Sequence, residues 1–356
     1  MILFVLLILL LCCVRMKFAG KGFFDDYIAP NEIQPIKGVF ILLIFISHFV
    51  TYVKIGGGLN ESYFALRGML GQMVVVPFLF YSGYGVTESV RRKGTAYVRA
   101  MPVNRLLKVL LQFDIAVMLY IGLQASLGRT YPLRRVLLSL IGWSGVGNSN
   151  WYILAILLLY LCTFLAFWAF RDPKQEWMAH LAVTVLCLLY IWATKRHRDS
   201  YDSYCYNTVL AYVAGGWYSL LRGRIEALVK SSNRIWLLLT GMLAVSFYAL
   251  RRSWGSLTAY ELSAVVFALL ILCLTAKVKI RSRALAYCGK HLFSLYILQR
   301  LPMIALHNTP IAQMPYLYFA VCLAVTLVLS WLFDLGYGAL WKALTRLFSR
   351  KTPQQA

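Results

Sequence analysis

Long apolar runs, separated by short polar segments, make up almost the whole chain. Most contain roughly 15–20 residues, about the length that an α-helix needs to cross the hydrocarbon core of a bilayer. The first run, MILFVLLILLLCCV over residues 1–14, is followed by the cations Arg15, Lys17 and Lys21. Because no basic leader precedes this run, we expect a retained short helix with its N-terminus outside, not a cleaved signal peptide.

The same pattern predicts ten further spans. They cover residues 36–53, 69–87, 106–127, 151–170, 178–194, 205–221, 235–250, 257–275, 290–307 and 315–341. No segment between them is long enough for a separate globular domain. The sequence therefore predicts an all-α, polytopic transmembrane bundle of ten core helices plus one extra N-terminal helix. We divide it into a hydrophobic helix with a cytoplasmic lead-in (1–30), a membrane domain (31–341) and a basic cytoplasmic tail (342–356).

Composition and charge agree with a membrane protein. Hydrophobic residues make up 60% of the chain and charged residues 14%, whereas about a quarter of a soluble protein is charged. The net charge of +23 would indicate nucleic-acid binding in a soluble protein. In a membrane protein, cationic loops retained on the cytoplasmic side and facing anionic lipid explain it. We expect membrane lipids, and no nucleic acid, among the partners.

The distribution of cations predicts the orientation. With the segment before residue 36 assigned to the cytoplasm, the inner loops carry more than twice as many Lys and Arg residues as the outer loops. This asymmetry is typical of multi-pass proteins of the cell membrane and places the C-terminus in the cytoplasm. The eight cysteines are scattered and contain no CxxC motif, so we expect neither a metal site nor a disulfide framework.

One predicted span contains two residues that do not fit a plain membrane helix. In IKGVFILLIFISHFVTYV (36–53), Lys37 and His48 are eleven residues apart, which places them on one helix face about 16 Å apart along the axis. Lys37 can extend its ammonium to the headgroups, whereas His48 lies near the middle of the membrane. Two interpretations stay open. His48 is either a structural histidine bonded to a neighbouring helix or a general base, a role that suits histidine because its ordinary pKa is near neutrality.

Five segments, in order, resemble one known family. They are IKGVFILLIFISHF (36–49), VVPFLFYSGYGVTESV (75–90), RRKGTAYVRAMPVNRLLKVL (91–110), NWYILAILLLYL (150–161) and GKHLFSLYILQ (289–299). Together they resemble acyltransferase family 3, membrane enzymes that include polysaccharide O-acetyltransferases, over about residues 31–340. The signature of a Lys or Arg, ten residues and a His is met by Lys37 and His48. Two features depart from the family: the apolar segment before residue 31, and Gln299, where many members have a histidine.

The resemblance implies transfer of an acyl group, usually acetyl, from acyl-CoA to a hydroxyl of a glycan or lipid-linked sugar. His48 would act as general base or as acyl carrier, with Lys37, Ser82 and Tyr84 among the catalytic residues. The residues expected to bind the CoA phosphates are Arg91, Arg92, Arg99 and Arg105; the alternative for each is ordinary cytoplasmic loop charge. The glycines of SGYG (82–85) either let a substrate approach the helix or allow close helix packing.

Arg300 is a further candidate because of its depth. His48, Ser82 and Arg300 lie about 16, 14 and 15 Å from the cations Lys37, Arg91 and Lys290 that mark the inner membrane edge. A charged arginine at that depth needs a cavity or a partner. We expect Arg300, helped by Gln299 or Tyr296, to stabilise an oxyanion beside His48, or else to form a structural pair with a neighbouring helix.

The main alternative function is a transporter or flippase for a lipid-linked sugar. Such a protein would also use buried polar groups and basic loops. It should show inverted repeats or paired broken helices, and the sequence has no visible signal for either.

Trp151 and Tyr152 open a predicted helix at the outer interface, where an aromatic belt is the default explanation.

Overall fold

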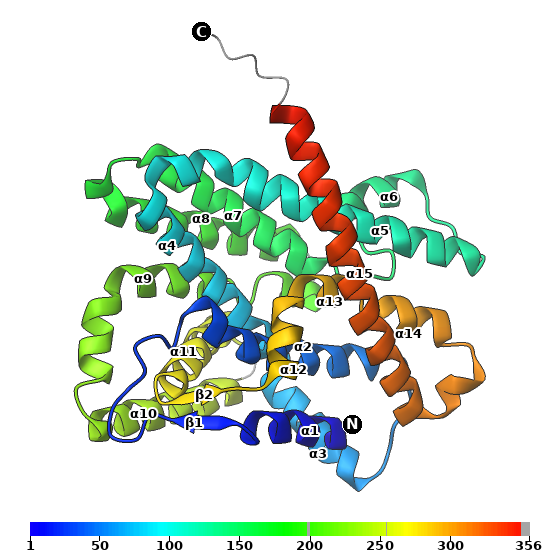
Figure 1. Cartoon of the computed structure of the whole chain (residues 1–356), viewed down its shortest axis with the longest axis horizontal. Coiled ribbons are helices and arrows are strands. Elements are labelled where there is room, and N and C mark those ends of the chain that lie inside the picture. Colours follow the sequence, from blue (N-terminus) through cyan, green and yellow to red (C-terminus); the bar gives the residue numbers. More distant parts are fainter. Residues whose placement is uncertain (198–199, 254, 350–356) are drawn as a thin grey trace.

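The computed structural model describes residues 1–197, 200–253 and 255–349. Within these ranges, seven helical segments are long and apolar enough to cross a membrane. They are Pro30–Phe49, Asn60–Ser126, Trp151–Ala169, Pro173–His197, Asn233–Arg252, Leu257–Thr275 and Pro315–Leu347. Helices dominate the structure (Figure 1). The predicted all-α, multi-pass architecture is therefore confirmed.

The N-terminal half contains eight of the elements labelled in Figure 1. They are α1 (Ile2–Cys13), β1 (Met16–Phe18), α2 (Pro30–Phe49), α3 (Gly58–Leu70), α4 (Val76–Met101), α5 (Lys108–Ser126), α6 (Leu133–Leu140) and α7 (Trp151–Ala169). The short helices η1 (Gly71–Val75) and η2 (Pro102–Leu107) lead into α4 and α5.

The C-terminal half continues the bundle. Its elements are α8 (Glu176–His197), α9 (Leu210–Val229), α10 (Asn233–Arg252), α11 (Leu257–Thr275), β2 (Val278–Ile280), α12 (Arg283–Lys290), α13 (Leu292–Leu298), α14 (Arg300–Leu306) and α15 (Pro315–Ser349). The predicted basic tail begins inside α15, which continues past residue 342, and the last part of that tail, residues 350–356, lies outside the described residues.

Three predicted spans need correction, of which the one expected at 205–221 is shifted to Leu210–Val229 (α9). The span expected at 69–87 begins later, at Val76, because Gly71 has a positive φ of 51° and Pro77 is suited to the first turn of a new helix. The span expected at 290–307 is interrupted at His291 and again at Gln299. Pro302 has no N–H to donate to the carbonyl of Leu298, which weakens the helix at that point. The count of ten core helices stays a prediction.

The segment before α2 is held against the loop between α11 and α12. Strands β1 and β2 pair antiparallel, with Met16 opposite Ile280. Lys279 forms ion pairs with Asp26 and, at 3.4 Å, with Glu32. The hydrogen bond from Lys279 lowers the pKa of the Asp26 carboxyl. The predicted lead-in therefore has a defined position beside the core.

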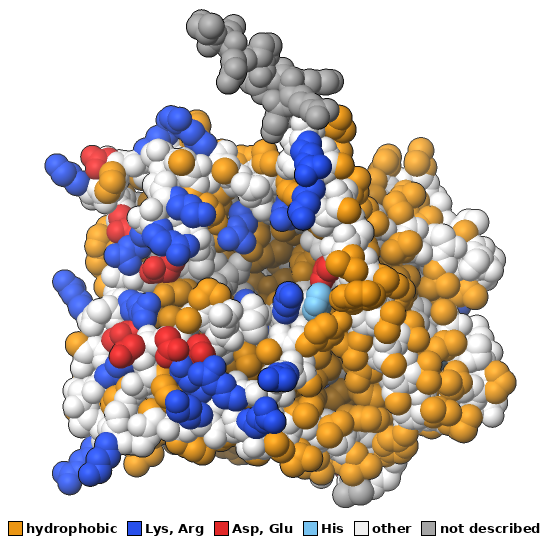
Figure 2. Space-filling model, viewed as in Figure 1, with side chains coloured by type: hydrophobic (Ala, Val, Ile, Leu, Met, Phe, Trp, Pro, Cys, Tyr) orange, Lys and Arg blue, Asp and Glu red, His pale blue; other side chains and the backbone are white. Residues whose placement is uncertain are grey.

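Charged side chains are distributed unevenly over the surface. Figure 2 shows Lys and Arg gathered on the side where Figure 1 places β1, β2, α9 and the bend of α4, while the opposite side is largely apolar. This is the polarity that the uneven loop charges predict for a protein lying across a membrane.

Glycines allow two pairs of helices to approach closely. A Cβ on Gly83 of α4 would clash with the carbonyl oxygen of Tyr212 on α9, and one on Gly215 of α9 would clash with that of Phe80 on α4. Gly38 of α2 meets α12 at Leu285 in the same way. The backbones are thus in contact at these positions, as in other membrane helices packed through small residues. For Gly83, the packing interpretation of SGYG holds.

Gly83→Ala is expected to destabilise the fold by about 1–3 kcal/mol, because the added methyl group forces α4 and α9 apart. Thermal unfolding of the purified protein in detergent measures the effect. Gly85→Ala is the matched control on the same helix, since its added Cβ would meet no atom within 4 Å and would extend into a cavity. Equal unfolding temperatures for the two variants would contradict the close approach at Gly83.

Candidate active site

Two cavities lie next to each other inside the bundle. The first has a volume of about 340 Å³ and is lined by residues of α2, η1, α4, η2, α5, α7 and α13. The second has a volume of about 410 Å³ and is lined by residues of α2, α3, η1, α7 and α13. Val75 and Tyr296 line both cavities. The two cavities therefore share a wall.

The first cavity, here called the Lys37 cavity, is cationic. Lys37 of α2 and Arg105 of η2 line it, and its described lining contains no carboxylate. Arg105 donates from Nε to the hydroxyl of Tyr97 at 2.9 Å, and its guanidinium carbon lies 5.7 Å from the ring centroid of Tyr160. Both contacts hold the guanidinium at the cavity, where it adds to the positive charge of Lys37.

Ser82 lines the same cavity. Its Oγ forms a hydrogen bond of 2.7 Å with the hydroxyl of Tyr160 on α7. Gly85, one turn further along α4, also lines the cavity. The two glycines of SGYG therefore divide between the two interpretations: Gly83 allows helix packing, while Gly85 leaves space for a ligand.

The second cavity, here called the His48 cavity, surrounds the last turn of α2. His48 lines it together with Ser47, Arg67 of α3, Gln72 of η1 and Trp151 of α7. The imidazole is only partly buried, and its Nδ1 has one long contact of 3.5 Å, with the hydroxyl of Ser149. His48 thus faces the cavity, with Ser149 and Gln299 as its polar neighbours.

Tyr296 separates the two cavities. Its ring centroid lies 6.3 Å from that of His48 and 5.4 Å from that of Tyr152, which lines the Lys37 cavity. The side chain is 5% exposed, and its hydroxyl has no hydrogen-bond partner among the described residues. A buried hydroxyl without a partner is unfavourable, so this position is suited to contact with a ligand.

Arg300 begins α14, four residues after Tyr296, and lines neither cavity itself. Its charge acts on His48 and Tyr296, and its Nε is buried without a partner among the described residues. Its backbone N–H donates to the hydroxyl of Tyr120 at 3.1 Å, while the carbonyl of Tyr296 accepts from the side chain of Gln299 at 2.9 Å. The interrupted hydrogen bonding between α13 and α14 therefore lies at the site.

Other predicted site residues lie elsewhere. The hydroxyl of Tyr84 accepts from Nη1 of Arg222 at 2.9 Å, and Tyr84 lines neither of the two cavities. Arg92 and Arg99 are exposed and also line neither. The structure thus gathers Lys37, Ser82 and Arg105 in the Lys37 cavity. Tyr84, Arg92 and Arg99 lie apart from that cavity.

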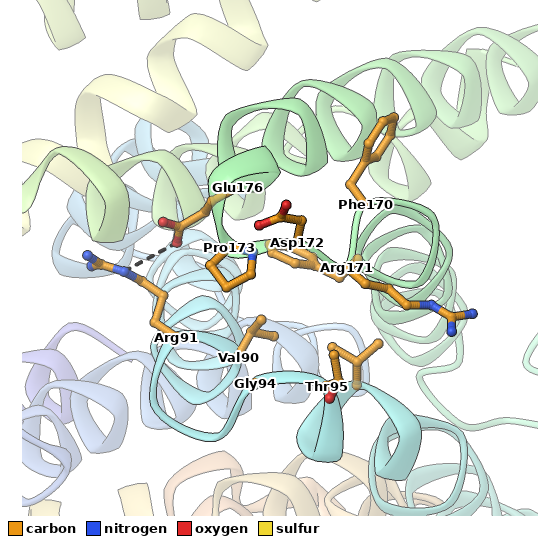
Figure 3. Close-up of a pocket in the computed structure, with 11 residues that line it drawn as sticks. Val90, Arg91, Gly94, Thr95, Phe170, Arg171, Asp172, Pro173 and Glu176 are labelled. Carbon is orange, nitrogen blue, oxygen red and sulfur yellow. Dashed lines mark ion pairs between the residues drawn. The ribbon is translucent and has the colours of Figure 1, made fainter.

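Arg91 lines a third cavity, of about 190 Å³, between α4 and the start of α8. There its Nε is 3.2 Å from a carboxylate oxygen of Glu176, the ion pair drawn in Figure 3. Its Nη1 contacts the carboxylate of Glu88 at 3.5 Å and the carbonyl of Ser219 at 3.0 Å. Its guanidinium is therefore engaged in ion pairs away from the Lys37 cavity.

Several residues of the site were not singled out by their sequence pattern. Trp151 and Tyr152, interpreted as an interfacial belt, line the His48 and Lys37 cavities respectively. Ser149, Arg67 and Gln72 lie in loops or at helix ends. The available signal was the polar and aromatic cluster NSNWY at the start of α7.

A comparison with protein families decides the assignment. The sequence profile described as an acyltransferase domain, acyltransferase family 3, matches residues 31–335. The chain belongs to this family. The match includes every residue that lines the two cavities except Pro30, and it excludes α1 and β1. It confirms the resemblance inferred from the motifs. No curated protein and no solved structure matches the chain.

Proposed function

We propose that this acyltransferase moves an acetyl group from cytoplasmic acetyl-CoA to a hydroxyl of a glycan or lipid-linked sugar. The observation that supports this most strongly is the pair of cavities on either side of Tyr296. One contains two cations, and the other contains a histidine accessible from its cavity. Two substrates can thus approach a common wall from different sides.

The Lys37 cavity suits the donor. CoA carries phosphates, which cations bind through charge-assisted hydrogen bonds, and the guanidinium of Arg105 can do so with two donors. The remaining lining is largely apolar and aromatic, as the pantetheine arm and the acetyl group require. A thioester in this cavity would bring its carbonyl carbon to Tyr296.

The His48 cavity suits the acceptor. Neutral His48 would take the proton of the acceptor hydroxyl while that oxygen attacks the thioester carbonyl. Collapse of the tetrahedral intermediate forms the ester C–O bond, breaks the C–S bond and releases the CoA thiolate, which recovers the proton from His48. Alternatively, His48 accepts the acetyl group first and passes it to the acceptor. In both routes, Arg300 would stabilise the carbonyl oxyanion.

The transporter alternative has one supporting observation, the interruption between α13 and α14. Membership of an acyltransferase family favours chemistry at that interruption over passage of the sugar. Radiolabelled acetyl-CoA, incubated with the purified protein, distinguishes the two. We expect release or transfer of acetyl, whereas a flippase would leave the thioester intact.

Arg105→Gln is expected to raise the KM for acetyl-CoA by about tenfold, because it removes one charge-assisted hydrogen bond worth about 1.5 kcal/mol. The salt dependence of KM should weaken as well. Initial rates at increasing acetyl-CoA and NaCl concentrations measure both effects.

Arg92→Gln is the matched control, because Arg92 is exposed and lines neither cavity. Thermal unfolding of both variants separates a binding effect from loss of the Arg105–Tyr97 contact. If Arg92→Gln raised KM as much as Arg105→Gln, the CoA phosphates would bind outside the Lys37 cavity.

A further inference from the structure

Arg67 gives the His48 cavity a positive charge. It lines the cavity together with Ser47, His48, Gln72, Trp151 and other residues, and the described lining contains no Asp or Glu. No described carboxylate lies within ion-pair distance of Arg67, whereas Arg91 has two such partners, Glu88 and Glu176. Arg67 can therefore bind an anionic group of a ligand.

The position of Arg67 is set by Ser47, the residue next to His48. Arg67 donates from Nε to the hydroxyl of Ser47 at 3.0 Å and from Nη2 to its carbonyl at 3.4 Å. Nη1 forms no hydrogen bond or ion pair with any described residue, and the charge of Arg67 acts on His48. One side of the guanidinium is thus anchored beside the imidazole, while the other remains available to a ligand.

Two further groups in the same cavity fit a sugar. The side-chain oxygen of Gln72 is buried and has no partner among the described residues, so it can accept a hydrogen bond from a hydroxyl. Trp151 adds a flat apolar surface to the lining, against which a sugar ring can pack. The cavity therefore combines a hydroxyl acceptor, an aromatic surface and a cation.

We propose that the His48 cavity binds an acceptor sugar carrying an anionic group, a carboxylate or a phosphate, near the hydroxyl that is acylated. Arg67 pairs with that group, Gln72 accepts from a sugar hydroxyl, and His48 faces the hydroxyl that reacts. This inference rests on the proposed function for the reaction itself, but the binding of the anionic sugar can be measured without catalysis.

Protection of His48 against diethyl pyrocarbonate tests the binding. The purified full-length protein is treated with the reagent, and the modification rate of the His48 peptide is followed by mass spectrometry. Glucuronate and glucose 1-phosphate are compared with glucose and inorganic phosphate at equal ionic strength. We expect one or both anionic sugars to slow modification about threefold when present at about twice their Kd. Whichever protects more identifies the anionic group.

Variants of Arg67 establish the source of the selectivity. Arg67→Gln should abolish the difference between charged and neutral sugars, and Arg67→Lys should retain part of it, because lysine keeps the charge but loses the planar fork. Lys54→Gln is the control, because Lys54 is exposed and lies beyond the end of α2. It should show the same difference in protection between charged and neutral sugars as the wild-type protein. Equal protection by glucose, no protection by either anionic sugar, or equal protection by inorganic phosphate would overturn the proposal.

A transfer assay with the same sugars separates this inference from the proposed function. Acetylation without preference for the anionic sugars would support the proposed function and overturn the inference. Charge-selective, Arg67-dependent protection without acetyl transfer or acetyl-CoA hydrolysis would support the anionic site and contradict the proposed reaction.

Discussion

Replacing His48 with alanine is expected to lower acetyl transfer by about 10²–10⁴-fold, the usual cost of losing a general base. Expression and thermal unfolding should stay nearly unchanged, because the imidazole faces a cavity and its hydrogen-bond contact to Ser149 is long, at 3.5 Å. Transfer of radiolabelled acetyl from acetyl-CoA by equal amounts of purified protein provides the measurement.

His197→Ala is the matched control, since His197 is exposed at the end of α8. It should retain full activity. If His48→Ala kept more than half of the transfer activity, the proposed role of His48 would be wrong. A marked fall in unfolding temperature would instead support the structural interpretation of this histidine.

Arg300→Lys is expected to lower kcat by at least about tenfold with little change in KM, because the oxyanion forms only during the reaction. Lysine keeps the positive charge but cannot reproduce the fixed donor geometry of the guanidinium. The backbone N–H of Arg300, which donates to Tyr120, is unaffected by this change, so the fold should survive. Steady-state kinetics together with thermal unfolding measure the two effects separately.

The structural alternative for Arg300 gives a different result. If the guanidinium only stabilises the helix packing, Arg300→Lys lowers the unfolding temperature while the remaining folded protein keeps its normal kcat. Arg252→Lys is the matched control, because Arg252 is exposed at the end of α10 and bonds to Tyr248 of its own helix. Neither kcat nor the unfolding temperature should change in that variant.

The arginines predicted to bind the donor are placed by the tertiary structure. The hydropathy pattern predicts that the span containing Ser82 ends at residue 87 and that Arg91, Arg92 and Arg99 follow in a loop. In the structure α4 continues to Met101, and Gly94 interrupts it with a φ of 58°. Glycine adopts this backbone conformation without the strain that a side chain would cause. The chain then returns through η2, which brings Arg105 to the Lys37 cavity.

Local periodicity and hydropathy alone determined much of this protein. The apolar runs predict membrane helices, and the spacing of Lys37 and His48 places both on one face of α2, which the motifs connect with an acyltransferase. These features depend on residues that are contiguous in the chain, so they can be recognised without the fold.

Only the tertiary structure decided that Lys37 and His48 line separate cavities with Tyr296 between them. That wall joins Val75 of η1 and Tyr296 of α13, which are far apart in the sequence. Arg67 likewise reaches the site because α3 packs its guanidinium against Ser47. Such neighbours are set by helix packing between distant segments, and no periodicity within a single segment specifies which of them meet.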